Sequence, residues 1–91
     1  MTRTKLLVGS LSNDLFRVAT LRQRGANKAA SRFLVEAKRW AEPLLTQLDK
    51  VYLKSIANKV LNSDPVNITL VDAEYYLMYG VLLQNHALHS D

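Results

Sequence analysis

The side chains best suited to chemistry in this 91-residue chain are cations, because groups that could catalyse a reaction are scarce. Seven Lys and Arg residues lie between positions 17 and 39, with Glu36 as the one acid among them. Clustered cations bind phosphate backbones, because each neutralised phosphate releases counterions, and they also attract acidic protein surfaces. The predicted anion- or partner-binding residues are Arg17, Arg22, Arg24, Lys28, Arg32, Lys38 and Arg39.

Catalytic and metal-binding arrangements are not indicated. The sequence contains no cysteine, which excludes a thiol nucleophile, disulfides and thiolate metal sites. The two histidines, His86 and His89, lie next to the C-terminus, so a Ser/His/Asp site would have to form at a chain end. Their spacing allows a shared metal with Asp91, but a histidine pair in a terminal turn is more often exposed to solvent. We therefore expect no enzyme activity, no cofactor and no metal site.

Charge is distributed unevenly along the sequence. Residues 1–40 contain nine basic and two acidic side chains, a net charge of +7, and residues 41–91 contain three basic and six acidic ones, a net charge of −3. Such asymmetry is typical of a nucleic-acid surface, and it can equally make two copies attract each other.

No targeting or membrane segment is indicated. The apolar triplet at residues 6–8 is much shorter than the core of a signal peptide, about 7–15 residues. The longest uncharged stretch, residues 75–90, falls short of the ~20 apolar residues of a membrane span. We expect no membrane association and, with no cysteine to pair, a cytoplasmic protein.

Apolar residues recur at helical spacing in three segments, 4–24, 27–62 and 69–88, which predict one all-α domain spanning residues 1–91. Gly25 is expected to end the first helix and Asn27 to cap the second. Pro43 lacks an amide donor and interrupts the long central segment near residues 40–42. The prediction is a bundle of three helices with the central one bent, or of four helices if Pro43 breaks it. Thr69 and Asp72 have the spacing of a capping box before the last helix.

The middle of the last segment, residues 75–83, is apolar on all sides. Apolar residues make up 48% of the chain, and a domain this short has little interior, so we expect this helix to be buried, partly against another copy. Tyrosine suits such interfaces, because its ring can be buried while its hydroxyl finds a partner. Gly80 would let another helix approach closely. The predicted oligomer interface is Tyr75, Tyr76, Met78, Tyr79 and Leu82.

Two hypotheses for function follow. The first is a small self-associating interaction or adaptor module, a homodimer that docks on a partner protein through its basic N-terminal half. The alternative is a nucleic-acid-binding protein that uses the basic surface of residues 17–39. The aromatic residues near these cations, Phe16 and Phe33, fit the apolar core stripe and not a base-stacking surface, which favours protein docking.

Overall fold

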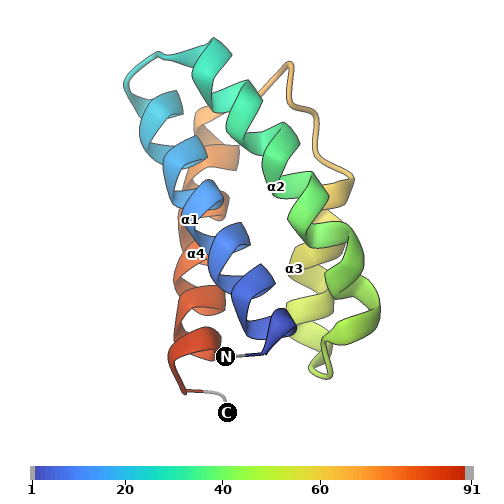
Figure 1. Cartoon of the computed structure of the whole chain (residues 1–91). Helices are drawn as coiled ribbons and strands as arrows, with labels where there is room; N and C mark the ends of the chain where they lie inside the picture. Colours follow the sequence, from blue (N-terminus) through green and yellow to red (C-terminus); the bar gives the residue numbers. More distant parts are fainter. Residues whose placement is uncertain (1, 90–91) are drawn as a thin grey trace.

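The computed structural model describes residues 2–89 and shows an up-down-up-down bundle of α-helices (Figure 1). The described part forms four helices, α1 (Arg3–Gln23), α2 (Asn27–Gln47), α3 (Val51–Leu61) and α4 (Leu70–His89). Helix α1 packs against both α2 and α4, and α3 packs mainly against α2. The predicted all-α helical bundle is confirmed.

The ends of α1 and α4 follow from local sequence signals. Gly25 has a φ of 81°, its amide donates to the carbonyl of Arg22, and the amide of Ala26 donates to that of Leu21. This pair of bonds is a Schellman ending, for which glycine is preferred because a Cβ disfavours positive φ.

The predicted capping box at the start of α4 is also confirmed. The Asp72 amide donates to Thr69 Oγ1 at 3.0 Å, and the Thr69 amide donates to Asp72 Oδ2 at 2.9 Å. Each side chain thus satisfies an amide that the helix start would leave without a partner.

The second predicted segment divides at a different place from the one expected. Pro43 lies inside α2, and the chain leaves the helix only at Leu48, whose ψ is 137°. Pro43 removes one backbone hydrogen bond, but Ala41 and Leu44 on either side of it are fully buried, and this packing holds the helix together. Neither glycine nor proline marks the actual break at residues 48–50. Asn27 is likewise the first helical residue and not the cap, a position that Ala26 occupies without a side-chain bond.

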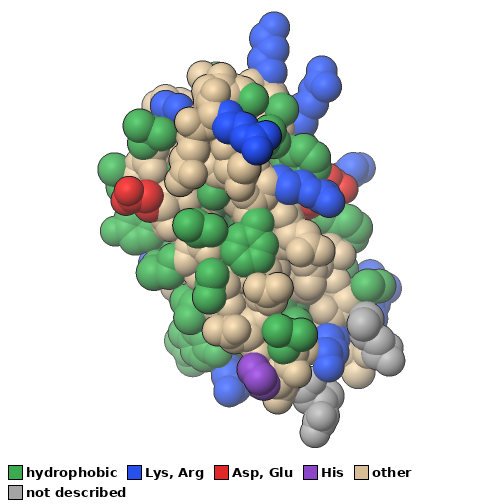
Figure 2. Space-filling model, turned by 90° about the vertical axis from the view of Figure 1, so that its left-hand side faces the viewer, with side chains coloured by type: hydrophobic (Ala, Val, Ile, Leu, Met, Phe, Trp, Pro, Cys, Tyr) green, Lys and Arg blue, Asp and Glu red, His purple; other side chains and the backbone are tan. Residues whose placement is uncertain are grey.

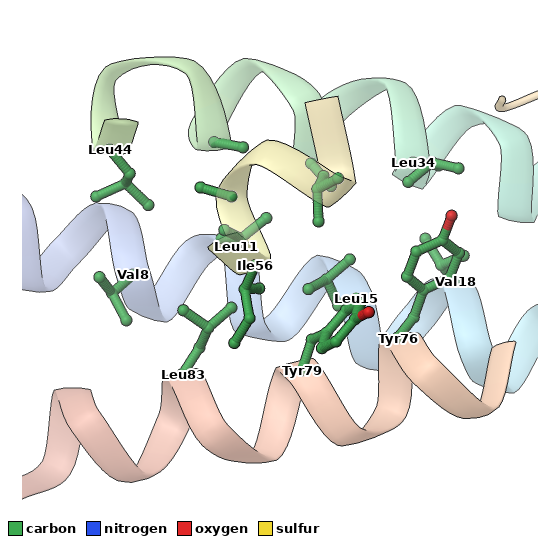
Figure 3. Close-up of a cluster of buried hydrophobic side chains, with 14 of the residues drawn as sticks. Val8, Leu11, Leu15, Val18, Leu34, Leu44, Ile56, Tyr76, Tyr79 and Leu83 are labelled. Atoms are coloured by element: carbon green, nitrogen blue, oxygen red, sulfur yellow. The ribbon is translucent and has the colours of Figure 1, made fainter. Parts of the chain in front are cut away.

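The core lies along the middle of the bundle, where side chains from all four helices meet (Figure 3). Its labelled members are Val8, Leu11, Leu15 and Val18 of α1, Leu34 and Leu44 of α2, Ile56 of α3, and Tyr76, Tyr79 and Leu83 of α4.

Helices α1 and α4 approach closely at Gly80, as the sequence predicts for this position. The Ser12 hydroxyl donates to the Gly80 carbonyl at 2.7 Å, and Ser12 is buried. A Cβ added at Gly80 would lie 2.8 Å from Cε1 of the Phe16 ring, closer than carbon atoms can approach. The helix admitted by Gly80 therefore belongs to the same chain.

Candidate interaction surfaces

Helix α4 is covered by the rest of the chain on only one face. The opposite face carries eight apolar side chains that are each between 37 and 67% exposed. Figure 2 views the molecule from the side on which α4 lies, and hydrophobic side chains gather along much of its length. The eight are Leu70, Val71, Tyr75, Leu77, Met78, Val81, Leu82 and Leu88, and we call this set the α4 outer face.

The predicted interface residues divide between the two faces. Tyr75, Met78 and Leu82 belong to the α4 outer face, with exposures of 51, 47 and 37%. Tyr76 and Tyr79 are only 6 and 8% exposed, and their rings meet edge to face in the core. These two tyrosines therefore lie outside the exposed surface, because helical spacing places them on the same face as the fully buried Leu83, which follows Tyr79 by four residues and Tyr76 by seven.

Five members of the α4 outer face are absent from the predicted interface. They are Leu70, Val71, Leu77, Val81 and Leu88. Gly80 could have identified only Val71, which lies nine residues before it and so on the opposite side of the helix. Leu77 is three residues before Gly80, a spacing that favours the same side, and nothing in the sequence indicates that it is exposed. Leu77 and Val81, expected to be buried, are 44 and 43% exposed.

Two of the seven predicted cations hold the connection between α3 and α4. Arg22 Nε donates to the Ile68 carbonyl at 2.6 Å, and Lys38 Nζ donates to the Ser63 carbonyl at 2.6 Å. Both residues are half-buried. Their positive charges satisfy backbone acceptors of this chain, so they contribute less to a surface for a partner.

A third cation, Arg17, is exposed to solvent but contacts two other side chains of the same chain. Its guanidinium lies 5.2 Å from the centre of the Phe33 ring, and its Nη1 lies 3.6 Å from Asp14 Oδ1. Arg17 thereby joins α1 to the side of α2. Phe33, which the sequence places in the core stripe, is half-buried under this guanidinium.

The four remaining cations, Arg24, Lys28, Arg32 and Arg39, are exposed. The last three are spaced by four and seven residues along α2, so they form one row on its outer side. The structure thus divides the predicted cluster into three groups. Arg22 and Lys38 bind the connection between α3 and α4, Arg17 packs on Phe33, and the other four cations are exposed.

The segment between α3 and α4 lies against cations of the basic first half of the chain. Arg22 near the end of α1 and Lys38 in the middle of α2 hold the segment from Ser63 to Ile68, which contains Asp64.

Asp14 forms a buried polar contact that the sequence did not indicate. It is 3% exposed, and its Oδ2 accepts a hydrogen bond from Trp40 Nε1 at 2.9 Å. Burial, and to a lesser degree the nearby Glu36, raises the pKa of Asp14, while the hydrogen bond from Trp40 and the positive charge of Arg17 oppose that rise. One oxygen of this carboxylate binds Trp40 of α2, and the other lies next to Arg17 of α1. Asp14 therefore links α1 to α2.

A hollow of about 340 Å³ borders α1 around Thr20 and is lined by Phe16, Leu21 and Phe33 with Arg17 and Arg24. Among residues 2–89, no cluster of three or more His, Asp or Glu side chains is arranged to hold a metal ion. Asp91, the third ligand considered with His86 and His89, is outside the described residues. None of the helices within that range is long and apolar enough to cross a membrane.

No family model, curated protein or solved structure matches this chain. The case for a function therefore depends on the surfaces described above. Two of them stand out: the apolar outer face of α4, and the exposed cations Arg24, Lys28, Arg32 and Arg39.

Proposed function

We propose that the protein is a small self-associating helical interaction module, and that the α4 outer face is where two copies meet. The observation that carries this proposal is the row of eight half-exposed apolar side chains on one helix. Monomeric proteins rarely leave apolar patches larger than a few hundred Å² in water, and larger patches mark interaction sites. Burial of this face in a dimer would remove that surface from water.

In the same proposal, the basic half of the molecule docks a partner protein. The hollow around Thr20 supports this role, because it combines an apolar lining with the guanidinium groups of Arg17 and Arg24. A protein surface that carries an apolar side chain next to carboxylates fits both features.

The test of self-association replaces Val81 with aspartate. Val81 is 43% exposed on α4, and Val35 is 49% exposed on α2, so Val35→Asp is a matched control. Either new carboxylate stays hydrated in the single chain, and only Val81→Asp places a charge in the proposed interface. In sedimentation at tens of micromolar we expect a dimer for the wild type and Val35→Asp, and a monomer of 10.3 kDa for Val81→Asp. A monomeric wild type would contradict the proposal.

Nucleic-acid binding is the second candidate function, favoured by the row of Lys28, Arg32 and Arg39 on the outer side of α2. Affinity for random duplex should then fall with a log–log salt slope of about −0.9 per phosphate contacted. Replacing Lys28 and Arg32 with alanine should flatten that slope by roughly two and weaken all sequences alike. Absence of binding at low salt would eliminate this candidate.

A further inference from the structure

The exposed positions of α4 are arranged symmetrically about the midpoint between Tyr79 and Gly80. Counting outward from that midpoint, the twelve exposed residues of α4 fall into six pairs, each with both members exposed. The pairs are Met78 with Val81, Leu77 with Leu82, Tyr75 with Gln84, Glu74 with Asn85, Val71 with Leu88, and Leu70 with His89. Two α4 helices laid antiparallel about this midpoint would therefore bring each residue opposite its pair member.

Pair members also match in chemical type. Three pairs join apolar side chains to apolar side chains, while Leu70 and His89 form the one unlike pair. In the other two pairs, the Glu74 carboxylate can accept from the Asn85 amide, and the Tyr75 hydroxyl can bond the Gln84 amide. Tyr75, Gln84, Glu74 and Asn85 would thus find hydrogen-bond partners within the interface, as buried polar groups require.

Electrostatics favours the antiparallel arrangement over the parallel one. Glu74 is the one exposed carboxylate in the described part of α4, since Asp72 is half-buried, and a parallel pair would place Glu74 against its own copy. Parallel packing would also bring like ends of the helix dipoles together, whereas antiparallel packing sets opposite ends side by side. A polar pair on the central line of a helix interface is a known way to fix orientation and register.

The surface available is suited to a second copy. Helix α4 has 20 residues and so extends about 30 Å, and twelve of them are exposed. A standard interface uses about 20–30 residues on each side, so neighbouring residues of α1 would complete it. A hollow of about 300 Å³ between α1 and α4, beside Leu88, joins the two helices, and Leu6, which is 58% exposed, lies on its border. In the antiparallel register, Val71 of the second copy faces this end of α4.

We infer that a second copy of this chain binds the α4 outer face with its own α4 in the antiparallel direction. The two-fold axis crosses the interface at the level along α4 that is midway between Tyr79 and Gly80. This inference rests on the self-association proposed above and adds its partner geometry. Each copy contributes the same residues, so the interface closes on itself and produces a dimer rather than a filament.

Single cysteines test this geometry, because the natural sequence has none. Val71→Cys and Leu88→Cys replace exposed side chains that face each other only in the antiparallel dimer. A disulfide requires Cα atoms within about 7 Å, and in that dimer two copies of either single variant hold their cysteines about 25 Å apart. Met78→Cys, close to the axis, reports proximity of the two helices, and Val66→Cys, 90% exposed outside α4, reports random collisions.

Under mild oxidation we expect Met78→Cys to cross-link with itself. An equimolar mixture of Val71→Cys and Leu88→Cys, one carrying a mass tag, should give the mixed dimer several-fold above the Val66→Cys level. Each of the two alone should stay at that level. Self-linking of Val71→Cys and of Leu88→Cys would show a parallel pair and overturn the inference, and so would failure of Met78→Cys to link.

Sedimentation of the wild type separates the two proposals. A monomeric wild type contradicts self-association itself, and the inference with it. A dimeric wild type with the wrong cross-linking pattern overturns only the antiparallel geometry. Circular dichroism spectra of all four cysteine variants in the reduced state should show the helix content of the wild type, so that cross-linking is compared between folded proteins.

Discussion

Helix α1 makes two contacts that are built on different principles. Against α4, Ser12 and Phe16 meet Gly80, a residue without a side chain. Against α2, a carboxylate is buried and bonded to Trp40. The first contact requires that residue 80 has no side chain, and the second requires a hydrogen-bond donor for the buried Asp14 carboxylate. A change in shape should therefore disrupt the first, and a change in protonation should affect the second.

The largest effect is expected for Gly80→Ala. The added methyl group would lie 2.8 Å from the Phe16 ring, so the free energy of unfolding should fall by about 1–3 kcal/mol through overpacking. Gly9→Ala is the matched control, because a Cβ at Gly9 meets nothing within 4 Å, and it should stabilise the helix by up to about 1 kcal/mol.

A double-mutant cycle identifies the cause of the Gly80→Ala effect. If crowding by the Phe16 ring is responsible, Phe16→Ala should remove much of the additional loss in urea melts. If Gly80→Ala and Gly9→Ala both raised the free energy of unfolding by the same amount, α1 and α4 would not be in close contact at this point.

A smaller effect is expected for Asp14→Leu. This variant removes the acceptor of the Trp40 indole N–H, and an unpaired, half-buried donor should lower the free energy of unfolding by about 1 kcal/mol. Asp14→Asn retains a carbonyl oxygen for the indole and should be tolerated. The comparison is made by urea denaturation at pH 7, and equal losses in the two variants would mean that the Trp40 bond contributes nothing.

The smallest effect concerns pH. Because the pKa of Asp14 is raised on folding, the folded chain binds more protons than the unfolded chain between the two pKa values. The contribution of Asp14 to stability is therefore larger at acid pH and decreases as pH rises through this window. Relative to Asp14→Asn, the wild type should gain stability as pH is lowered from 7 to about 4. A constant difference between the two proteins across that range would contradict the assignment.

Features of the fold set by a few neighbouring residues could be predicted from the sequence. The capping box at Thr69 and the glycine ending at Gly25 each need only residues within one turn of helix. The end of α2 could not be predicted, because residues 48–50 contain neither glycine nor proline. Asp14 follows Ser12 and Asn13, a run typical of a helix start, and its burial depends on Trp40, 26 positions away.

The candidate surfaces show the same limit. Apolar residues surround α4, so composition alone does not tell which face the chain covers, although Gly80 indicates part of it. The basic residues were identified by type, but Arg22 and Lys38 are bound by carbonyls 46 and 25 positions away. These cations are close together in the sequence, but in the folded chain some bind backbone carbonyls and others are exposed to solvent.

The placement of α3 has a consequence for local opening. This helix has 11 residues and packs mainly against α2, whereas α1 has neighbours on two sides. Segments with fewer packed neighbours open at a lower free energy than the whole molecule unfolds. In hydrogen–deuterium exchange, the amides of α3 should therefore exchange faster, through local opening of this helix. Those in the middle of α1 should exchange only when the whole molecule unfolds.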